Sequence, residues 1–170
     1  MILTKFLVVL GIGNSIRMDD GAGIRVVELL EQDKTLKKLK VSFKYLNTGG
    51  LDILDEIDGY THAIIVDAAS MADQGLKPGE FFYLENLNKL EIKETSEISS
   101  HGVGVFGFLK YAKVGGYQIP DPIEVYGIQV KETGFFSEEL TPEVANAVKD
   151  LVIILKKKIL DLYSNIEIDG

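Results

Sequence analysis

Short apolar runs alternate with amphipathic stretches along this chain. The runs, continuous or partly alternating, predict strands at residues 6–10, 41–46, 62–67, 80–84 and 123–128. Apolar positions also recur at helical spacing, in stretches that begin near residues 20, 51, 103 and 142. Because strands alternate with helices, we expect an α/β fold: a single three-layer domain with a mostly parallel, twisted sheet of about five strands and helices on both faces.

The last helix has the clearest boundary signals. Thr141 followed by Pro142 is typical of a helix start, with a capping threonine and a proline in the first turn. Lys156, Lys157 and Lys158 are expected near the end of the helix, where positive charge suits the dipole. Its apolar stripe, predicted to face the core, comprises Val144, Val148, Leu151, Val152, Leu155 and Ile159. We therefore expect one domain over residues 1–163 and a flexible tail over residues 164–170.

Composition narrows the classes of function. The formal net charge is −8, from 18 basic and 26 acidic residues, which argues against binding to nucleic acid or to an anionic membrane. The absence of cysteine excludes disulfides, thiolate catalysis and cysteine zinc sites. The apolar N-terminal run of residues 1–13 is too short to span a bilayer. We expect a cytoplasmic protein without membrane insertion.

Two acids and a histidine are the candidate site. Asp20 follows the first predicted strand, Asp67 ends the third, and His101 precedes a predicted helix. Parallel α/β sheets bind ligands at the carboxyl ends of their strands, and a 2-1-3 strand order would make the first and third strands neighbours. Oxygen and imidazole ligands suit nickel, zinc and similar divalent ions, and three protein ligands leave coordination positions open for a substrate.

Each of these residues also has a structural interpretation. An aspartate at a helix start commonly caps the helix, which applies to Asp19 and Asp20. Asp67 could be a turn residue, and His101 a solvated loop or capping residue. Only their expected convergence on one edge of the sheet favours a site.

Other chemistries lack their motifs. Residues 11–16 begin like a dinucleotide fingerprint, but Ile16 stands where the third glycine belongs. No phosphate-binding loop and no Gly-x-Ser-x-Gly elbow occurs. His62 lies at the start of a buried strand and is expected to be structural. We expect no nucleotide cofactor.

The motifs resemble those of the nickel–iron hydrogenase maturation endopeptidases over most of the chain. The resemblance rests on six strings: Gly11-Ile12-Gly13-Asn14, Asp19-Asp20-Gly21-Ala22-Gly23, Ile64-Ile65-Val66-Asp67-Ala68, Leu76-Lys77-Pro78-Gly79-Glu80, Ser100-His101 and Gly127-Ile128-Gln129. Two of them, Asp-Asp-Gly and Leu-x-Pro-Gly-Glu, resemble the branch that processes hydrogenlyase-type or membrane-bound hydrogenases.

The resemblance implies an endopeptidase that removes the C-terminal extension of a hydrogenase large-subunit precursor after nickel insertion. The family's catalytic and metal-contacting positions fall on Asp20, Asp67 and His101. The metal would be nickel carried by the substrate, for which zinc or another divalent ion can substitute. Many relatives carry glutamate at the position of Asp20, so the shorter side chain here changes the reach of the ligand but not its type.

Two other functions remain open at this point. The same residues could hold a nickel-bearing tail without cutting it, as a non-catalytic binding or chaperone domain. A small-molecule hydrolase on a similar sheet is a third possibility, and it would need an enclosed pocket instead of an open groove.

Overall fold

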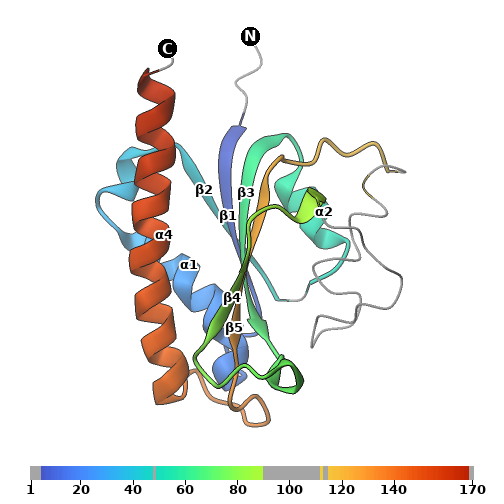
Figure 1. Cartoon of the computed structure of the whole chain (residues 1–170), viewed down its shortest axis with the longest axis vertical. Coiled ribbons are helices and arrows are strands. Elements are labelled where there is room, and N and C mark those ends of the chain that lie inside the picture. Colours follow the sequence, from blue (N-terminus) through green and yellow to red (C-terminus); the bar gives the residue numbers. More distant parts are fainter. Residues whose placement is uncertain (1–4, 48, 90–111, 113–114, 169–170) are drawn as a thin grey trace.

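The computed structural model describes residues 5–47, 49–89, 112 and 115–168. These residues form one five-stranded sheet with helices on both faces (Figure 1). The strands are β1 (Lys5–Ile12), β2 (Val41–Leu46), β3 (Tyr60–Ala69), β4 (Phe81–Leu84) and β5 (Ile123–Gln129). The α-helices are α1 (Ala22–Gln32), α2 (Asp52–Ile57) and α4 (Pro142–Ile168). Short 3-10 turns are η1 (Met18–Gly21), η2 (Leu36–Lys38), η3 (Ala72–Gln74) and η4 (Leu87–Lys89).

The strand order is β2-β1-β3-β5-β4. All neighbouring strands are parallel except β4, which pairs antiparallel with β5. The predicted α/β class and the predicted 2-1-3 order are both confirmed. Because β1 and β3 are neighbours and parallel, with Gly11 opposite Val66, their carboxyl ends lie at the same edge of the sheet. That edge is called the rim below.

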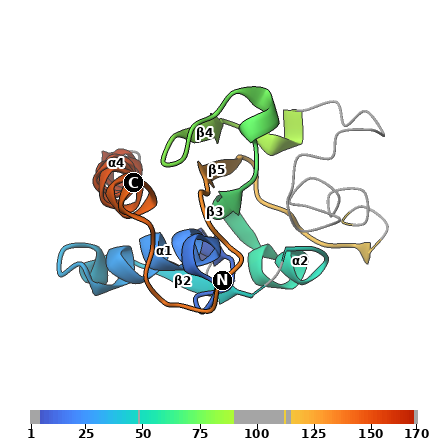
Figure 2. The same cartoon turned by 90° about the horizontal axis from the view of Figure 1, so that it is seen from below.

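Helices α1 and α4 cover one face of the sheet, and α2 covers the other (Figure 2). The long runs in β1, β3 and β5 are apolar because those strands are buried under both layers. Side chains on the α1 and α4 face include Leu7, Val9, Ile64 and Val66. Their neighbours on the same strands, including Val8, Leu10, Ala63 and Ile65, face α2. The alternation of side chains along each strand thus fills two separate cores.

Helix α4 begins at Pro142, and its predicted stripe is buried, with Val152 partly so. Two details differ from expectation. The Thr141 hydroxyl donates to Asp19 Oδ2 at 2.9 Å instead of capping the helix. The helix also continues to Ile168, so residues 164–168 are helical where a flexible tail is predicted.

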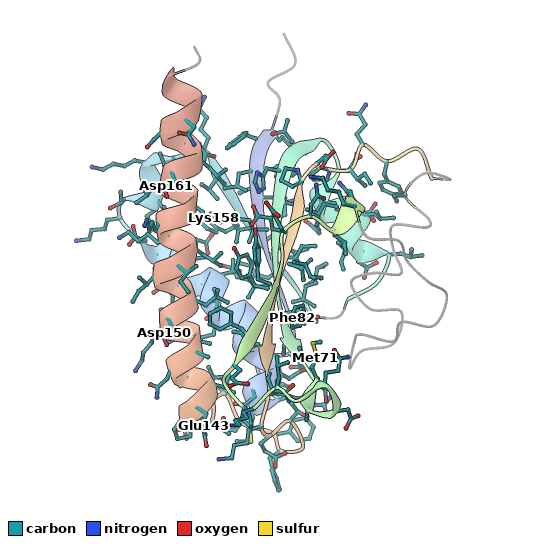
Figure 3. All side chains as sticks on the ribbon, in the orientation of Figure 1. Met71, Phe82, Glu143, Asp150, Lys158 and Asp161 are labelled. Carbon is teal, nitrogen blue, oxygen red and sulfur yellow. The ribbon has the colours of Figure 1, made fainter. Side chains whose placement is uncertain are left out.

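Lys156 and Lys158 lie well inside α4, not near its end as predicted, and each forms an ion pair. Lys156 Nζ lies 2.7 Å from Asp33 Oδ2, which ties α4 to the end of α1. Lys158 Nζ lies 2.6 Å from Glu124 Oε2, and its side chain extends from α4 toward the sheet (Figure 3). Both pairs bind the helix to residues that precede the lysine by more than thirty positions in sequence.

Glu124 is the centre of a buried polar cluster far from the rim. It is 3% exposed, and its carboxylate also contacts His62 Nε2 at 2.7 Å and accepts from the Tyr83 hydroxyl at 2.8 Å. Burial raises the pKa of Glu124, but the bonds from His62, Lys158 and Tyr83 outweigh burial and hold the pKa below its ordinary value of 4.5. The structural interpretation of His62 is therefore supported.

The helix predicted to begin near residue 103 lies outside the described residues, apart from Ala112. In the part of the chain that the structure describes, no helix is both long and apolar enough to cross a bilayer.

The Glu124 cluster makes a testable contribution to stability. Replacing Glu124 with glutamine should lower the free energy of unfolding at pH 7 by about 3 kcal/mol, because Lys158 loses its partner in a largely buried site. The folded pKa lies below 4.5, so the carboxylate's contribution is present above pH 4.5 and is lost as the pH falls through the folded value.

Urea unfolding of wild type and Glu124→Gln at pH 7 and at pH 3 measures this contribution. The gap between the two chains should shrink at the lower pH. Glu143→Gln is the matched control, because its ion pair with Lys131 is exposed on both sides and should contribute little. If the difference in unfolding free energy between the two chains is the same at pH 3 as at pH 7, the stabilising role assigned to the Glu124 carboxylate is contradicted.

Candidate functional site

Asp67 lies at the rim, near the carboxyl end of β3. It is 8% exposed and stands opposite Gly127 of β5 in the strand register. Figure 3 shows Met71, four residues beyond it, at the same end of the molecule as the start of α4 near Glu143. The predicted buried strand is confirmed, but Asp67 does not end it, because β3 continues to Ala69.

The turn that carries Asp20 begins directly after β1. Gly13 has a φ of +141°, and a Cβ at this position would lie 1.9 Å from the carbonyl oxygen of Asp20, so only glycine fits. Asn14 shapes the turn, because its side chain accepts from Ile16 N. The backbone amide of Asn14 donates to Asp20 Oδ2 at 3.2 Å. The Gly-x-Gly-Asn string therefore folds η1 back over the end of β1.

Gly23 brings the start of α1 onto the ends of both strands. A Cβ at Gly23 would lie 2.4 Å from the carbonyl oxygen of Val66 and 2.5 Å from that of Ile12. Val66 precedes Asp67, and η1, which contains Asp20, contacts β3. Asp20 and Asp67 therefore lie on contacting segments at the rim, where the positive end of the α1 dipole favours negative charge.

His101, the third predicted ligand, lies outside the described residues. Among the residues that the structure does describe, no three histidine or acidic side chains are grouped so that they could hold a metal ion. The geometry thus supplies two buried carboxylates, which suit a divalent cation or the orientation of a water molecule. The role of His101 stays a prediction from the sequence.

Asp19 is the important residue of this region that the sequence did not reveal. Its side chain is fully buried, and Oδ2 accepts from the backbone amides of Lys131 and Glu132, each at 2.9 Å. Thr141 adds its hydroxyl to Oδ2, and its amide donates to Oδ1 at 2.7 Å. One carboxylate thus ties η1 to both ends of the connection between β5 and α4.

The sequence shows Asp19 and Asp20 as an adjacent acidic pair, and it gives no sign of their different partners. In a 3-10 turn, successive side chains point about 120° apart, so the two carboxylates face different neighbours. Asp19 anchors the turn to residues 131–141, and Asp20 turns back toward Asn14.

Gln129 fixes the segment that follows Asp67. It is 3% exposed, its side-chain oxygen accepts from the Met71 amide, and its side-chain nitrogen donates to Val130 O at 2.8 Å. The Gly-Ile-Gln string at the end of β5 therefore holds the loop after β3 at the rim.

Comparison with known proteins was made once this geometry was clear. A family model described as hydrogenase maturation protease matches residues 24–158. The hydrogenase expression/formation protein HoxM of Cupriavidus necator is 28% identical over 146 residues, which is 86% of this chain and 70% of HoxM. The hydrogenase 2 maturation protease of Escherichia coli is 29% identical over 122 residues, or 72% of this chain and 71% of that protein.

A solved structure agrees with these relatives. The hydrogenase 2 maturation peptidase from a Thaumarchaeota archaeon superimposes with a TM-score of 0.65 at 27% identity, over 91% of this chain and 98% of the other. The likeness thus extends beyond the matched family segment to nearly the whole fold.

The anchoring role of Asp19 predicts a graded loss of stability. Asp19→Ala removes all four acceptor contacts in a buried place and should lower the free energy of unfolding by about 3 kcal/mol. Asp19→Asn keeps one oxygen and should cost less. Denaturant unfolding measures both.

Asp58→Ala is the matched control, because Asp58 is exposed and its side chain accepts a hydrogen bond from Gln118 N. It should lower the unfolding free energy by less than about 1 kcal/mol. Equal losses for Asp58→Ala and Asp19→Ala would show that Asp19 is not an anchor.

Proposed function

The chain belongs to the hydrogenase maturation protease family, and on that basis we propose that it removes the C-terminal extension of a nickel–iron hydrogenase large-subunit precursor after nickel insertion. The chain is thus an endopeptidase with a protein substrate. Its relatives are named as proteases and peptidases, which does not support a domain that only holds the precursor. That the client belongs to the hydrogenlyase or membrane-bound branch stays a prediction, as does the cytoplasmic location.

The observation that carries the proposal is the contact at the rim between η1, which contains Asp20, and β3, which contains Asp67. The two residues are 47 positions apart in the sequence. Gly13 and Gly23 allow the approach, because both positions lie against backbone that a side chain would displace. Both carboxylates are at low exposure beside the start of α1. Carboxylates in such a place are well suited to bind a divalent cation or to transfer a proton.

In our proposal the precursor's own nickel is the recognition element. Asp20 and Asp67 offer it oxygen ligands, and His101 completes the set with an imidazole nitrogen. Three ligands leave positions open for those the precursor itself provides. Docking of the nickel places the scissile peptide bond next to the rim, so that much of the rate comes from positioning. Zinc or another divalent ion can bind to the same three residues.

The chemical step is hydrolysis of one peptide bond. A water oxygen bonds to the scissile carbonyl carbon, and the bond from that carbon to the leaving nitrogen breaks. Asp20 takes a proton from the attacking water, and the leaving nitrogen gains a proton as it departs as an amine. The Asn14 amide, which donates to Asp20 Oδ2, holds that carboxylate in place while its charge changes.

Dependence on nickel is the first test. Purified protein should shorten a nickel-loaded precursor and leave the nickel-free precursor intact, as followed by mass spectrometry over time. The expected difference in rate is at least about 100-fold if the metal positions the bond. Equal rates on both precursors would rule out recognition through nickel.

The second test removes the ligands. Asp67→Asn and His101→Ala should each lower the processing rate by more than about 100-fold, because even outer partners of metal ligands contribute about 10- to 100-fold. Far-UV circular dichroism should stay unchanged.

Asp73→Asn is the matched control for this test. Asp73 is an exposed acid in η3, shortly after β3. Its substitution should leave the rate unchanged. Normal processing by either ligand variant would remove that residue from the site.

A further inference from the structure

A groove runs between α1 and α4 and reaches the turn that carries Asp20. Its volume is about 800 Å³. Met18 and Gly21 of η1 line one part of it, and Ile24, Leu29 and Val148 supply apolar surface from the two helices. This volume is enough for several side chains of a polypeptide. We call it the α1–α4 groove.

An aromatic patch adjoins the groove. Phe135 and Phe136 are 68% and 84% exposed, and Ile16 is 48% exposed. The patch is one surface, because Ser137 N donates to Ile16 O at 2.9 Å and Ser137 also bridges to Arg17. Large apolar residues that are gathered in the open commonly mark a protein interface.

The patch is held in place before any partner arrives. Arg17 donates to Thr133 O at 3.1 Å, and Gly134 N donates to the Glu132 carboxylate. Glu132 is in turn bound through its amide to the buried Asp19. A surface that is ordered in advance loses little conformational entropy on binding. Because Phe135 and Phe136 are exposed, they do not contribute to the hydrophobic core.

The charge of the groove indicates the character of the partner. Its lining includes Glu138 and Glu139, which form no ion pair with any residue in the described part of the chain. Arg25, another lining residue, is paired with Glu28 at 3.0 Å. Lys149 is the other basic residue of the lining, so two glutamates are set against one lysine. The surface therefore favours a segment that carries positive charge beside its apolar groups.

We propose that the α1–α4 groove and the aromatic patch together dock a segment of the precursor that contains aliphatic or aromatic side chains flanked by lysine or arginine. This inference rests on the proposed function. The docked segment lies outside the extension that is cut. Because Met18 and Gly21 belong to the same turn as Asp20, a segment seated in the groove continues directly to the rim. The docking surface thereby sets which precursor is presented to the carboxylates.

The apolar part is tested with Phe135→Ser/Phe136→Ser and nickel-loaded precursor. The KM should rise by about 10-fold or more, as expected for the loss of two central aromatic contacts. The kcat should stay within about 2-fold, because no group at the rim is changed. Ile153→Ser is the matched control, since Ile153 of α4 is also 68% exposed and should leave the KM unchanged.

The charged part is tested with Glu138→Lys/Glu139→Lys. The KM should rise again, and its dependence on salt should weaken, because the attraction to a basic segment is lost. Asp150→Lys is the control: Asp150 is exposed on α4 and does not line the groove. Figure 3 shows it on the helix above Glu143.

Three results would overturn the docking proposal. These are an unchanged KM for both double variants, a fall in kcat without a change in KM, and self-association of the wild type that the phenylalanine substitutions abolish. The last would make the patch an interface between two copies. If wild type does not shorten the precursor, the proposed function fails instead. Calorimetric binding of uncut precursor to wild type and to the double variants then decides the docking surface by itself.

Discussion

The close approach of the first helix to the ends of two parallel strands is the constraint on which the rim depends. Gly23 lies so near the carbonyl oxygens of Val66 and Ile12 that no side chain fits there. This contact sets the distance between α1 and the sheet. Together with the close contact at Gly13, it also sets the path of η1. The positions of Asp20 and Asp67 follow from that packing. Close backbone contacts therefore determine where the two acids lie at the rim.

Much of the architecture could be predicted from the sequence, because buried parallel strands are read directly from apolar runs such as residues 6–10 and 62–67. The neighbouring placement of β1 and β3 also followed, and with it the shared rim. Asp19 could not be predicted, because its partners are backbone amides more than 110 positions away. The ion pair between Lys158 and Glu124 could not be predicted either, because it joins helix α4 to strand β5 of the sheet. The pattern of apolar and polar residues within one segment does not indicate which distant residues that segment contacts.

The two ends of the sheet use buried charge for different purposes. At the end away from the rim, Glu124 has its charge balanced by Lys158, with His62 and Tyr83 as further partners. That cluster joins α4 to β3, β4 and β5, and it is neutralised within the described structure. At the rim, η1 and β3 bring Asp20 and Asp67 to the start of α1, and in our proposal the nickel of the precursor binds there together with His101. Buried charge thus holds the layers together at one end of the sheet and is proposed to bind substrate at the other.

The attachment of Asp19 to residues 131, 132 and 141 closes a backbone ring around the connection from β5 to α4. The stretch between the two points of attachment, residues 133–140, is also tied to this turn, because Met18 N donates to Ser137 O at 2.8 Å. The same stretch exposes the side chains of Phe135 and Phe136. Substitution of these exposed side chains leaves the backbone contacts with η1 in place. The surface of this segment can therefore vary while the backbone that carries Asp20 keeps its position.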